Sequence, residues 1–317
     1  MSAAPEKTLE NRRASRKNAL LLRVPQTIAV SAILASSLFL GPSPAWADED
    51  EGEDDPPGLV WRYRRHHVAD YVATGVFVAT ALTAELAPGE DVIGWRQTNP
   101  FDLWVRDTFV LGDYRGRRVA ARISDATISA LVAWHAVDAA IAWGVHDAPD
   151  VAWQMFALDA QAMTFTLAFT GVTKRIAARE RPAGHACRTD PSYDRRCEDQ
   201  GQFGSFFSGH TSLSFTSAAL TCHHHIAFPL YGGGAGDVIA CVSALFAASS
   251  VAYERILADR HWASDVLVGF AAGGLSGGLL PWLSFYGQPS TDVVARWSVA
   301  PTATPTGGGL SLQGLLF

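Results

Sequence analysis

Residues 151–182 read VAWQMFALDAQAMTFTLAFTGVTKRIAARERP, and this stretch changes from an apolar run to a basic segment. An apolar run of helical length, 151–178, lacks the alternation of a half-buried strand and ends in a basic segment that Pro182 terminates. Similar apolar runs occur at about 68–87, 123–144, 208–227, 237–257 and 263–286. The sequence therefore predicts an all-α fold, a bundle of six helices.

The six apolar runs approach the length that crosses a lipid bilayer, and their small residues suit close helix packing. The mean hydropathy is only slightly positive, and His135, Asp138 and Asp159 interrupt the runs. In lipid such residues must face the bundle interior, whereas in a soluble bundle they are ordinary. The sequence favours a membrane bundle and leaves a soluble or peripheral bundle open. A further amphipathic segment, 101–121, is too charged to span.

The N-terminal region is expected to direct the chain out of the cytoplasm. A basic stretch precedes an apolar run from Thr27 to Leu40, and Ala45-Trp46-Ala47 then offers small residues at the −3 and −1 positions. This order predicts a signal peptide over residues 1–47, although a retained anchor helix stays open. Seven acidic residues follow directly, so residues 48–60 are expected to form a disordered acidic leader.

The remaining chain is expected to form one helical domain, 61–288, with a loose C-terminal extension, 289–317, that contains one strand. The formal net charge of −6 gives no indication of a nucleic-acid partner. Four cysteines in an exported chain permit disulfides. Cys187 and Cys197 bracket a polar loop, and Cys222 and Cys241 flank a turn-like segment, so either pair could close a short loop. Free thiols remain an alternative for Cys222 and Cys241.

Three short polar clusters interrupt the apolar pattern. Lys174 and Arg181 lie seven residues apart, so both point from one helical face, as a phosphate dianion requires. Ser208-Gly209-His210 opens an apolar run, where N–H groups bind anions and His210 could donate a proton. Each cluster taken alone is explained as well by an ordinary charged or capped helix end.

The third cluster is the segment ERILADRHWASD, which contains Arg255, His261 and Asp265. Because Asp265 follows His261 by four residues, its carboxylate could take one imidazole N–H on a common helical face. The other imidazole nitrogen would then be free to attack an electrophile.

In order and spacing, the three clusters resemble the type 2 phosphatidic acid phosphatase and vanadium haloperoxidase superfamily. Its signature is Lys, six residues, Arg-Pro; then Pro-Ser-Gly-His; then Ser-Arg, five residues, His, three residues, Asp. The resemblance covers about 150–286 and departs at Phe207, where Pro is usual, and at Glu254, where Ser is usual. Glu254 is expected to face outward or to pair with an arginine. The matching residues are Lys174, Arg181, Pro182, Ser208, Gly209, His210, Arg255, His261 and Asp265.

The resemblance implies that His261, oriented by Asp265, attacks phosphorus to form a phosphohistidine, and that His210 protonates the leaving oxygen. It implies no metal and no other cofactor, because cations and N–H groups neutralise the phosphoryl charge. The groups that would hold the phosphoryl oxygens are Lys174, Arg181, Arg255 and the N–H groups of Ser208 and Gly209.

The function expected from the resemblance is a phosphatase acting on a phosphomonoester or pyrophosphate, with a membrane lipid as substrate. It would lie in a bacterial inner membrane with its site facing the periplasm. The alternatives are a soluble or peripheral exported acid phosphatase, a haloperoxidase with vanadate in the phosphate site, and a catalytically idle envelope protein.

The arrangement of the helices can also be predicted. In an antiparallel bundle the loops 179–207 and 256–263 should share one end, opposite the Pro229–Gly234 turn. His210 and His261 should face each other there, with an Asp265 oxygen about 3 Å from a nitrogen of His261. Cleavage after Ala47 followed by six crossings would put this end in the cytoplasm, whereas the site and a disulfide are expected on the periplasmic side. We therefore expect one segment not to cross the membrane, or the bundle to be peripheral.

Overall fold

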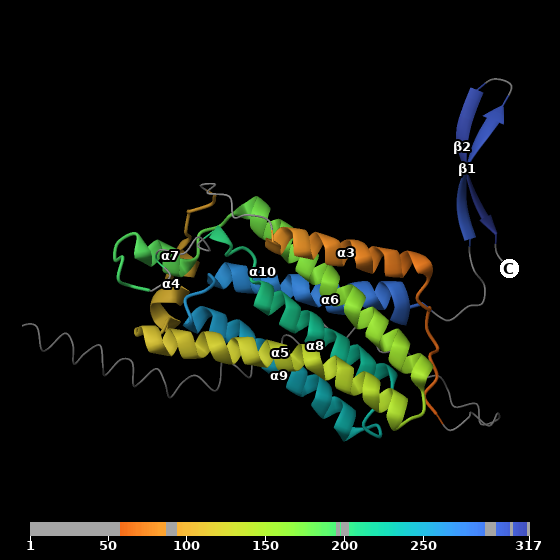
Figure 1. Ribbon diagram of the computed structural model, residues 1–317, viewed down its shortest axis with the longest axis horizontal. Coiled ribbons are helices and arrows are strands. Elements are labelled where there is room, and N and C mark those ends of the chain that lie inside the picture. Colours follow the sequence, from red (N-terminus) through yellow and green to blue (C-terminus); the bar gives the residue numbers. More distant parts are fainter. Residues whose placement is uncertain are drawn as a thin grey trace, which may run out of the picture.

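The computed structural model describes residues 58–86, 94–194, 197 and 203–288, and the backbone of 296–304 and 307–315. These residues form a bundle of long helices and a separate C-terminal hairpin (Figure 1). The predicted signal peptide and all but the last residues of the predicted acidic leader lie outside the described residues.

Each of the six predicted runs is a long helix, which confirms the all-α fold. Short connections join α5 to α6 and α8 to α9, so these neighbours run antiparallel (Figure 1). The sixth run continues past α10 through the π-helical turns η2 (Leu275–Leu279) and η3 (Trp282–Tyr286). The long helices are α3 (Val68–Leu86), α5 (Tyr114–Gly144), α6 (Pro149–Ala177), α8 (Gly209–Ala227), α9 (Ala235–Leu257) and α10 (Ala263–Gly274).

The charged segment 101–121 is divided between two helices. Helix α4 (Pro100–Phe109) begins at Asn99, whose side chain accepts the N–H of Asp102 at 2.8 Å. Helix α5 begins at Asp113, whose side chain accepts the N–H of Gly116 at 2.7 Å. Each N-cap side chain satisfies a backbone donor that has no partner within its helix. The segment therefore turns at 110–113, and α4 lies across the end of the bundle (Figure 1).

Helix α8 is the central helix and packs against α5, α6, α9 and α10. Its contact with α10 and η2 is close because glycines face it. A Cβ added to Gly273 would lie 2.4 Å from the carbonyl oxygen of Ser212, and one added to Gly277 would lie 2.2 Å from that of Thr216. A larger side chain at either position would push α10 away from α8. This contact fixes the start of α10 relative to the start of α8.

Both candidate cysteine pairs form disulfides. Cys187 is bonded to Cys197, beyond the short helix α7 (Pro182–Cys187). Cys222 is bonded to Cys241, so the bond joins α8 to α9 inside a core cluster. The alternative of free thiols at Cys222 and Cys241 is therefore excluded by the structure.

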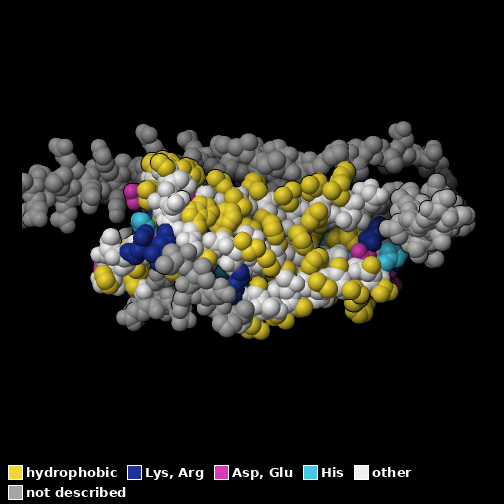
Figure 2. Space-filling view, turned by 90° about the horizontal axis from the view of Figure 1, so that it is seen from above, with side chains coloured by type: hydrophobic (Ala, Val, Ile, Leu, Met, Phe, Trp, Pro, Cys, Tyr) yellow, Lys and Arg dark blue, Asp and Glu magenta, His cyan; other side chains and the backbone are white. Residues whose placement is uncertain are grey.

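The outer face of the bundle is apolar. Large apolar side chains such as Val238 and Phe246 of α9 are more than half exposed. Apolar side chains cover much of the face seen in Figure 2. Five helices of the described chain are long and apolar enough to cross a membrane. Exposed apolar surface of this extent is unusual for a soluble monomer, so the structure favours the membrane bundle over the soluble one.

The polar residues within the helices lie inside the bundle. His135, Asp138 and Asp159 are at most 3 % exposed, as lipid surroundings demand. The histidines near the end of α8 lie inside the bundle as well, because His224 is fully buried and His225 is nearly so.

The C-terminal extension contains two strands where the sequence predicted one. Strand β1 (Arg296–Thr304) pairs antiparallel with β2 (Gly307–Leu315), with Arg296 opposite Leu315 and Thr304 opposite Gly307.

Candidate active site

The loop that joins α6 to α8 and the loop that joins α9 to α10 meet at one end of the bundle. Arg181 Nη1 donates to the carbonyl oxygen of Arg260 at 3.2 Å, and the Ala183 N–H donates to that of Asp259 at 3.3 Å. The turn between α8 and α9 lies at the other end (Figure 1). The predicted arrangement of the loops is therefore confirmed, and it brings the three sequence clusters together.

Three cationic side chains reach this end from different elements. Lys174 and Arg255 lie in the last turns of α6 and α9, and Arg181 is the N-cap residue of α7. A Cβ added to Gly209 would lie 3.2 Å from Lys174 Nζ, so the ammonium group lies directly over the start of α8. The cations thus surround a helix N-terminus, which itself carries partial positive charge.

His261 lies beside these cations and is only 4 % exposed. Burial and the positive charges of Arg181 and Lys174 hold the pKa of His261 well below its usual value. Its Nδ1 is 2.7 Å from the carbonyl oxygen of Ser205, which can only accept, so Nδ1 carries the proton. The imidazole is therefore neutral, and its lone pair is on Nε2. A neutral imidazole with a free nitrogen is the form that acts as a nucleophile.

The predicted contact of about 3 Å between Asp265 and His261 is wrong. Asp265 Oδ2 is 3.8 Å from His261 Nδ1, and the carbonyl of Ser205 takes the imidazole N–H instead. The prediction assumed that both residues lie on one helix, but α10 begins at Ala263, so His261 precedes its first turn. Asp265 Oδ2 accepts the Trp262 N–H at 2.9 Å and the Ser205 hydroxyl at 2.5 Å. Asp265 therefore orients His261 indirectly, through Ser205.

A buried arginine that the sequence did not single out supports this arrangement. Arg179 is 1 % exposed and forms ion pairs with Asp265 and, at 2.7 Å, with Asp102 of α4. Asp102 also accepts the N–H and the hydroxyl of Ser264, at 2.8 and 2.7 Å. Arg179 thus joins the end of α6 to α4 and to the first turn of α10. A buried charge that is paired and hydrogen-bonded on both sides holds its neighbours in one geometry.

Ser208 acts differently from the prediction. Its N–H donates to the carbonyl oxygen of Asp265 at 3.1 Å, so it is not directed at a phosphate. Its hydroxyl accepts from the Thr211 hydroxyl at 2.8 Å and caps α8. Gly209 and His210 form the first turn of α8, whose N–H groups have no acceptor within the helix. Of the two N–H groups predicted to bind an anion, that of Ser208 is therefore occupied by the carbonyl of Asp265.

His210 is paired with an acid that the sequence also did not indicate. Asp125 Oδ1, from α5, lies 2.9 Å from His210 Nε2 and 2.6 Å from an Arg255 nitrogen. Burial and Arg255 lower the pKa of His210 to about 4, and the Asp125 carboxylate opposes this shift. Asp125 is itself largely exposed, at 59 % of its side chain. A carboxylate thus bridges two groups that the resemblance assigns to the substrate, His210 to its leaving oxygen and Arg255 to its phosphoryl oxygens.

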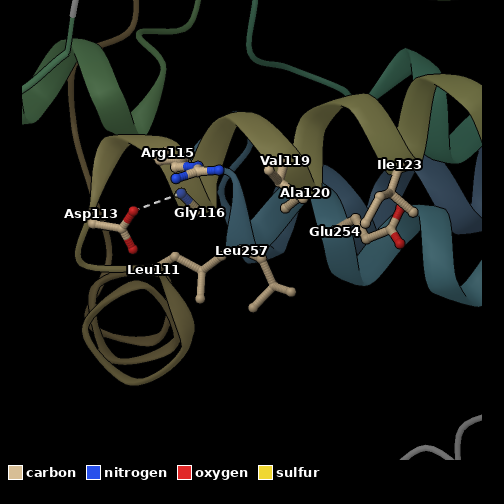
Figure 3. Close-up of a pocket in the computed structure, with 9 residues that line it drawn as sticks. All are labelled: Leu111, Asp113, Arg115, Gly116, Val119, Ala120, Ile123, Glu254 and Leu257. Atoms are coloured by element: carbon tan, nitrogen blue, oxygen red, sulfur yellow. Dashed lines mark hydrogen bonds between the residues drawn. The ribbon is translucent and has the colours of Figure 1, made fainter.

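The two departures from the family signature lie outside the cluster of cations. Phe207 is 1 % exposed and packs on Phe169, with ring centroids 5.4 Å apart, so it belongs to the core. Glu254 faces a groove between α5 and α9 (Figure 3), and Ser250 donates to it at 3.3 Å. That groove contains none of the three cations, so Glu254 points away from the site as predicted.

Most of the predicted site residues therefore meet. The pKa of His261 is lowered by the charges of Lys174, Arg181, Arg255 and His210, so all four side chains lie near its imidazole. Arg179, Asp102 and Asp125 were missed because their partners lie more than 75 residues away in the sequence. The only local signal for Arg179 was its position within the same basic segment as Lys174.

The comparison with known proteins agrees with this geometry. Residues 160–289 match the sequence model of the PAP2 superfamily. The chain is also 37 % identical over 93 residues to a lipid A 1-phosphatase from Porphyromonas gingivalis, a match that covers 29 % of this chain. That match spans only 19 % of the relative's length. No solved structure matches the chain. Residues 160–289, which contain all three polar clusters, are therefore similar to the PAP2 superfamily.

Proposed function

We propose that this protein is a phosphatase that transfers a phosphoryl group to His261 and then to water. The observation that carries the proposal is the state of His261, which is buried, neutral and surrounded by cations. Its Nδ1 is bonded to Ser205, and its Nε2 receives no hydrogen bond from the part of the chain that the structure describes. A neutral nucleophile among positive charges is suited to an anionic electrophile such as a phosphate ester.

Binding of the phosphate uses charges that the fold already holds in place. Lys174, Arg181 and Arg255 would contact its oxygens, together with N–H groups of the first turn of α8. Asp125 would lose its contact with Arg255 as the phosphate arrives, because both anions compete for that guanidinium. The dianion would also raise the pKa of His210 and favour its protonated form.

The reaction then takes two steps. His261 Nε2 attacks phosphorus in line, so a P–N bond forms while the bond to the leaving oxygen breaks. His210 gives its proton to that oxygen, and the alcohol departs. In the second step a water molecule gives a proton to His210 and attacks phosphorus, and the P–N bond breaks. Phosphate is released, and both histidines return to their starting states.

The cations supply the charge neutralisation that many phosphoryl-transfer enzymes obtain from magnesium. We therefore expect phosphate release to persist in EDTA at temperatures well below unfolding. Vanadate, which adopts the trigonal-bipyramidal geometry of the transferring phosphoryl group, should inhibit at micromolar concentration. Activity that is lost in EDTA and restored by a divalent metal would contradict this mechanism. Oxidation of bromide by the vanadate-loaded protein would instead identify a haloperoxidase.

The proposed substrate is a phosphorylated membrane lipid. The site lies at one end of a bundle whose outer face is apolar, so the bilayer would bring lipid headgroups to it. The relative named as a lipid A 1-phosphatase has a substrate of this class, although the chain covers little of its length.

The test is phosphate release by the full chain in detergent from a panel of lipid and water-soluble phosphomonoesters and pyrophosphates, with His261→Ala as the blank. A preference for lipids of at least tenfold in kcat/KM is expected. Equal turnover of soluble esters would favour a broad acid phosphatase. Phosphate release no faster than that of His261→Ala on every substrate would contradict the proposal that the protein is a phosphatase.

We also propose that the site faces the periplasm of a bacterial cell, because the Cys187–Cys197 disulfide lies in the site loop and disulfides persist in oxidising compartments. Trp61 packs on Phe228, at the opposite end of the bundle, and α3 runs from that end toward the site end beside α6 (Figure 1). With the site in the periplasm, α3 would begin on the cytoplasmic side, whereas a chain cleaved after Ala47 begins in the periplasm. Cleavage after Ala47 and six full crossings are therefore incompatible with this orientation. Labelling of thiols in unreduced cells should find Cys187 and Cys197 blocked; free thiols there would favour a cytoplasmic site.

A further inference from the structure

A second polar cluster lies deep in the bundle, at the other end of α8. His135 of α5, Asp159 of α6 and His224 of α8 are each at most 3 % exposed. Asp159 Oδ1 is 2.7 Å from His224 Nε2, and Asp159 Oδ2 is 3.0 Å from His135 Nδ1. One nitrogen or oxygen from each of the three residues falls within 4.8 Å of the other two. Fourteen residues of α8 separate His224 from His210, which corresponds to about 21 Å.

The hydrogen bonds around His135 show that the cluster is incomplete. The Ser217 hydroxyl donates to the carbonyl oxygen of Leu131 at 3.1 Å. Its oxygen, 2.8 Å from His135 Nε2, must therefore accept a proton from that nitrogen. A neutral His135 then has its lone pair on Nδ1, which faces an oxygen of Asp159. Two acceptors 3.0 Å apart repel each other unless a proton or a metal cation lies between them.

Neither atom has another partner. Among the described residues, His135 Nδ1 and Asp159 Oδ2 are buried and make no hydrogen bond, although they are near each other. Leaving a buried carboxylate oxygen unsatisfied is costly. A cation bound by both atoms would remove this cost.

The outer nitrogens of both rings are held as in metal sites. His135 Nε2 contacts Ser217, and His224 Nδ1 is 2.6 Å from the Tyr286 hydroxyl. Such partners fix the orientation of a ligating imidazole and direct its other nitrogen at the metal. Here both inner nitrogens are directed at the same carboxylate.

A neighbouring histidine provides a contrast. His225 Nδ1 is 2.6 Å from Asp237 Oδ1, but Asp237 also accepts the N–H groups of Tyr231 and Gly233, at 3.1 and 2.8 Å. Its oxygens are therefore occupied in stabilising the turn before α9. Among the described residues, by comparison, the partners of Asp159 are the two imidazoles alone.

We propose that His135, Asp159 and His224 bind one transition-metal dication, with zinc as the ion that fits best. Two imidazoles and one carboxylate are ligands that zinc accepts, with a fourth position left for water. Zinc bonds of 2.0–2.1 Å imply ligand atoms about 3.3 Å apart. The three ligand atoms here lie within 4.8 Å of one another, so the side chains would close in on the ion when it binds. The ion would join α5, α6 and α8 and would serve stability, not phosphate transfer.

The test uses the full chain in detergent, carrying an affinity tag without histidine. Protein stripped with EDTA is equilibrated with Zn²⁺, freed of excess metal and analysed for bound zinc. Wild type should retain about one zinc per chain, and zinc should raise its Tm by about 5 °C or more. Asp159→Asn, which keeps the shape of the side chain, should lose both effects. Asp237→Asn, the matched control, should lower Tm but keep the zinc.

Cobalt supplies a readout that does not depend on the variants folding. Co²⁺ added to the stripped wild type should give visible absorption bands as intense as those of tetrahedrally coordinated cobalt, and added Zn²⁺ should abolish them. Wild type that binds no more zinc than Asp159→Asn, or that gives no cobalt bands, would overturn the proposal. The cluster would then be an imidazolium–carboxylate group held by a proton alone. Persistence of phosphate release in the stripped protein is expected in either case.

Discussion

The two ends of α8 both contain histidines and charged residues, but they differ in how the charges are balanced. At the far end, the acid Asp159 lies between two imidazoles and the group is sealed inside the core. At the site end, cations gather around His261, and the acid paired with His210 and Arg255 is the exposed Asp125. A cluster with surplus positive charge that opens to solvent attracts an external anion, whereas an enclosed cluster needs an internal cation. The same helix therefore has the proposed phosphate site at one end and the proposed proton or metal site at the other.

Among variants that keep His261, the largest effect should come from His210, the proposed proton donor. We expect His210→Ala to lower kcat for alkyl phosphates by about 10²–10⁴-fold, which is the usual contribution of a general acid. Aryl phosphates with acidic leaving groups need little protonation and should lose less than about tenfold. The matched change at the far end, His224→Ala, should spare kcat for both kinds of ester and lower Tm. Steady-state kinetics with both esters checks this, and equal losses for His210→Ala across them would show that its role is not proton donation.

Arg179 should dominate the stability of the site end. Arg179→Ala leaves Asp102 and Asp265 buried without their cation, which typically costs about 3–5 kcal/mol. Arg175→Ala, one turn away on the exposed face of α6, should change stability by about 0.5 kcal/mol or less. Thermal unfolding in detergent compares the two variants. Similar Tm values for both would mean that the buried ion pairs do not hold the site together.

Asp125 should affect the pH dependence more than the rate. Its carboxylate raises the pKa of His210, so Asp125→Asn should lower that pKa further. Because the general acid must be protonated, activity toward alkyl phosphates should then decline at a lower pH than in wild type. The rate at the optimum should change by about tenfold or less. A pH profile of kcat is the measurement, and a decline that moves to higher pH would reverse the proposed sign.

Glu254 should have the smallest effect, although it is the most conspicuous departure from the family signature. It lies in the groove between α5 and α9, away from the cations (Figure 3). Glu254→Gln should therefore alter kcat/KM by about twofold or less, in keeping with a charge remote from the reaction. A gain of tenfold or more would show that this acid repels the substrate.

The sequence predicted the helices and the meeting of the three clusters because both depend on local patterns and on the alternation of an antiparallel bundle. It failed where a contact depends on where a helix begins: Asp265 misses His261 because α10 starts at Ala263. It also failed for partners from distant helices, such as Arg179 with Asp102 and His224 with Asp159. Those pairs depend on the relative rotation of packed helices, which no spacing within one segment reveals.

The central claim is that His261 carries the phosphoryl group. The most direct measurement is to mix the protein with substrate, quench it in alkali within milliseconds and locate the phosphate by mass spectrometry. A phosphohistidine survives alkali and is hydrolysed by acid, so acid-quenched samples serve as the control. We predict phosphate on His261, its absence in His261→Ala, and its accumulation in His210→Ala when an aryl phosphate is used. Turnover without any phosphoenzyme, or phosphate on His210 instead, would contradict the account.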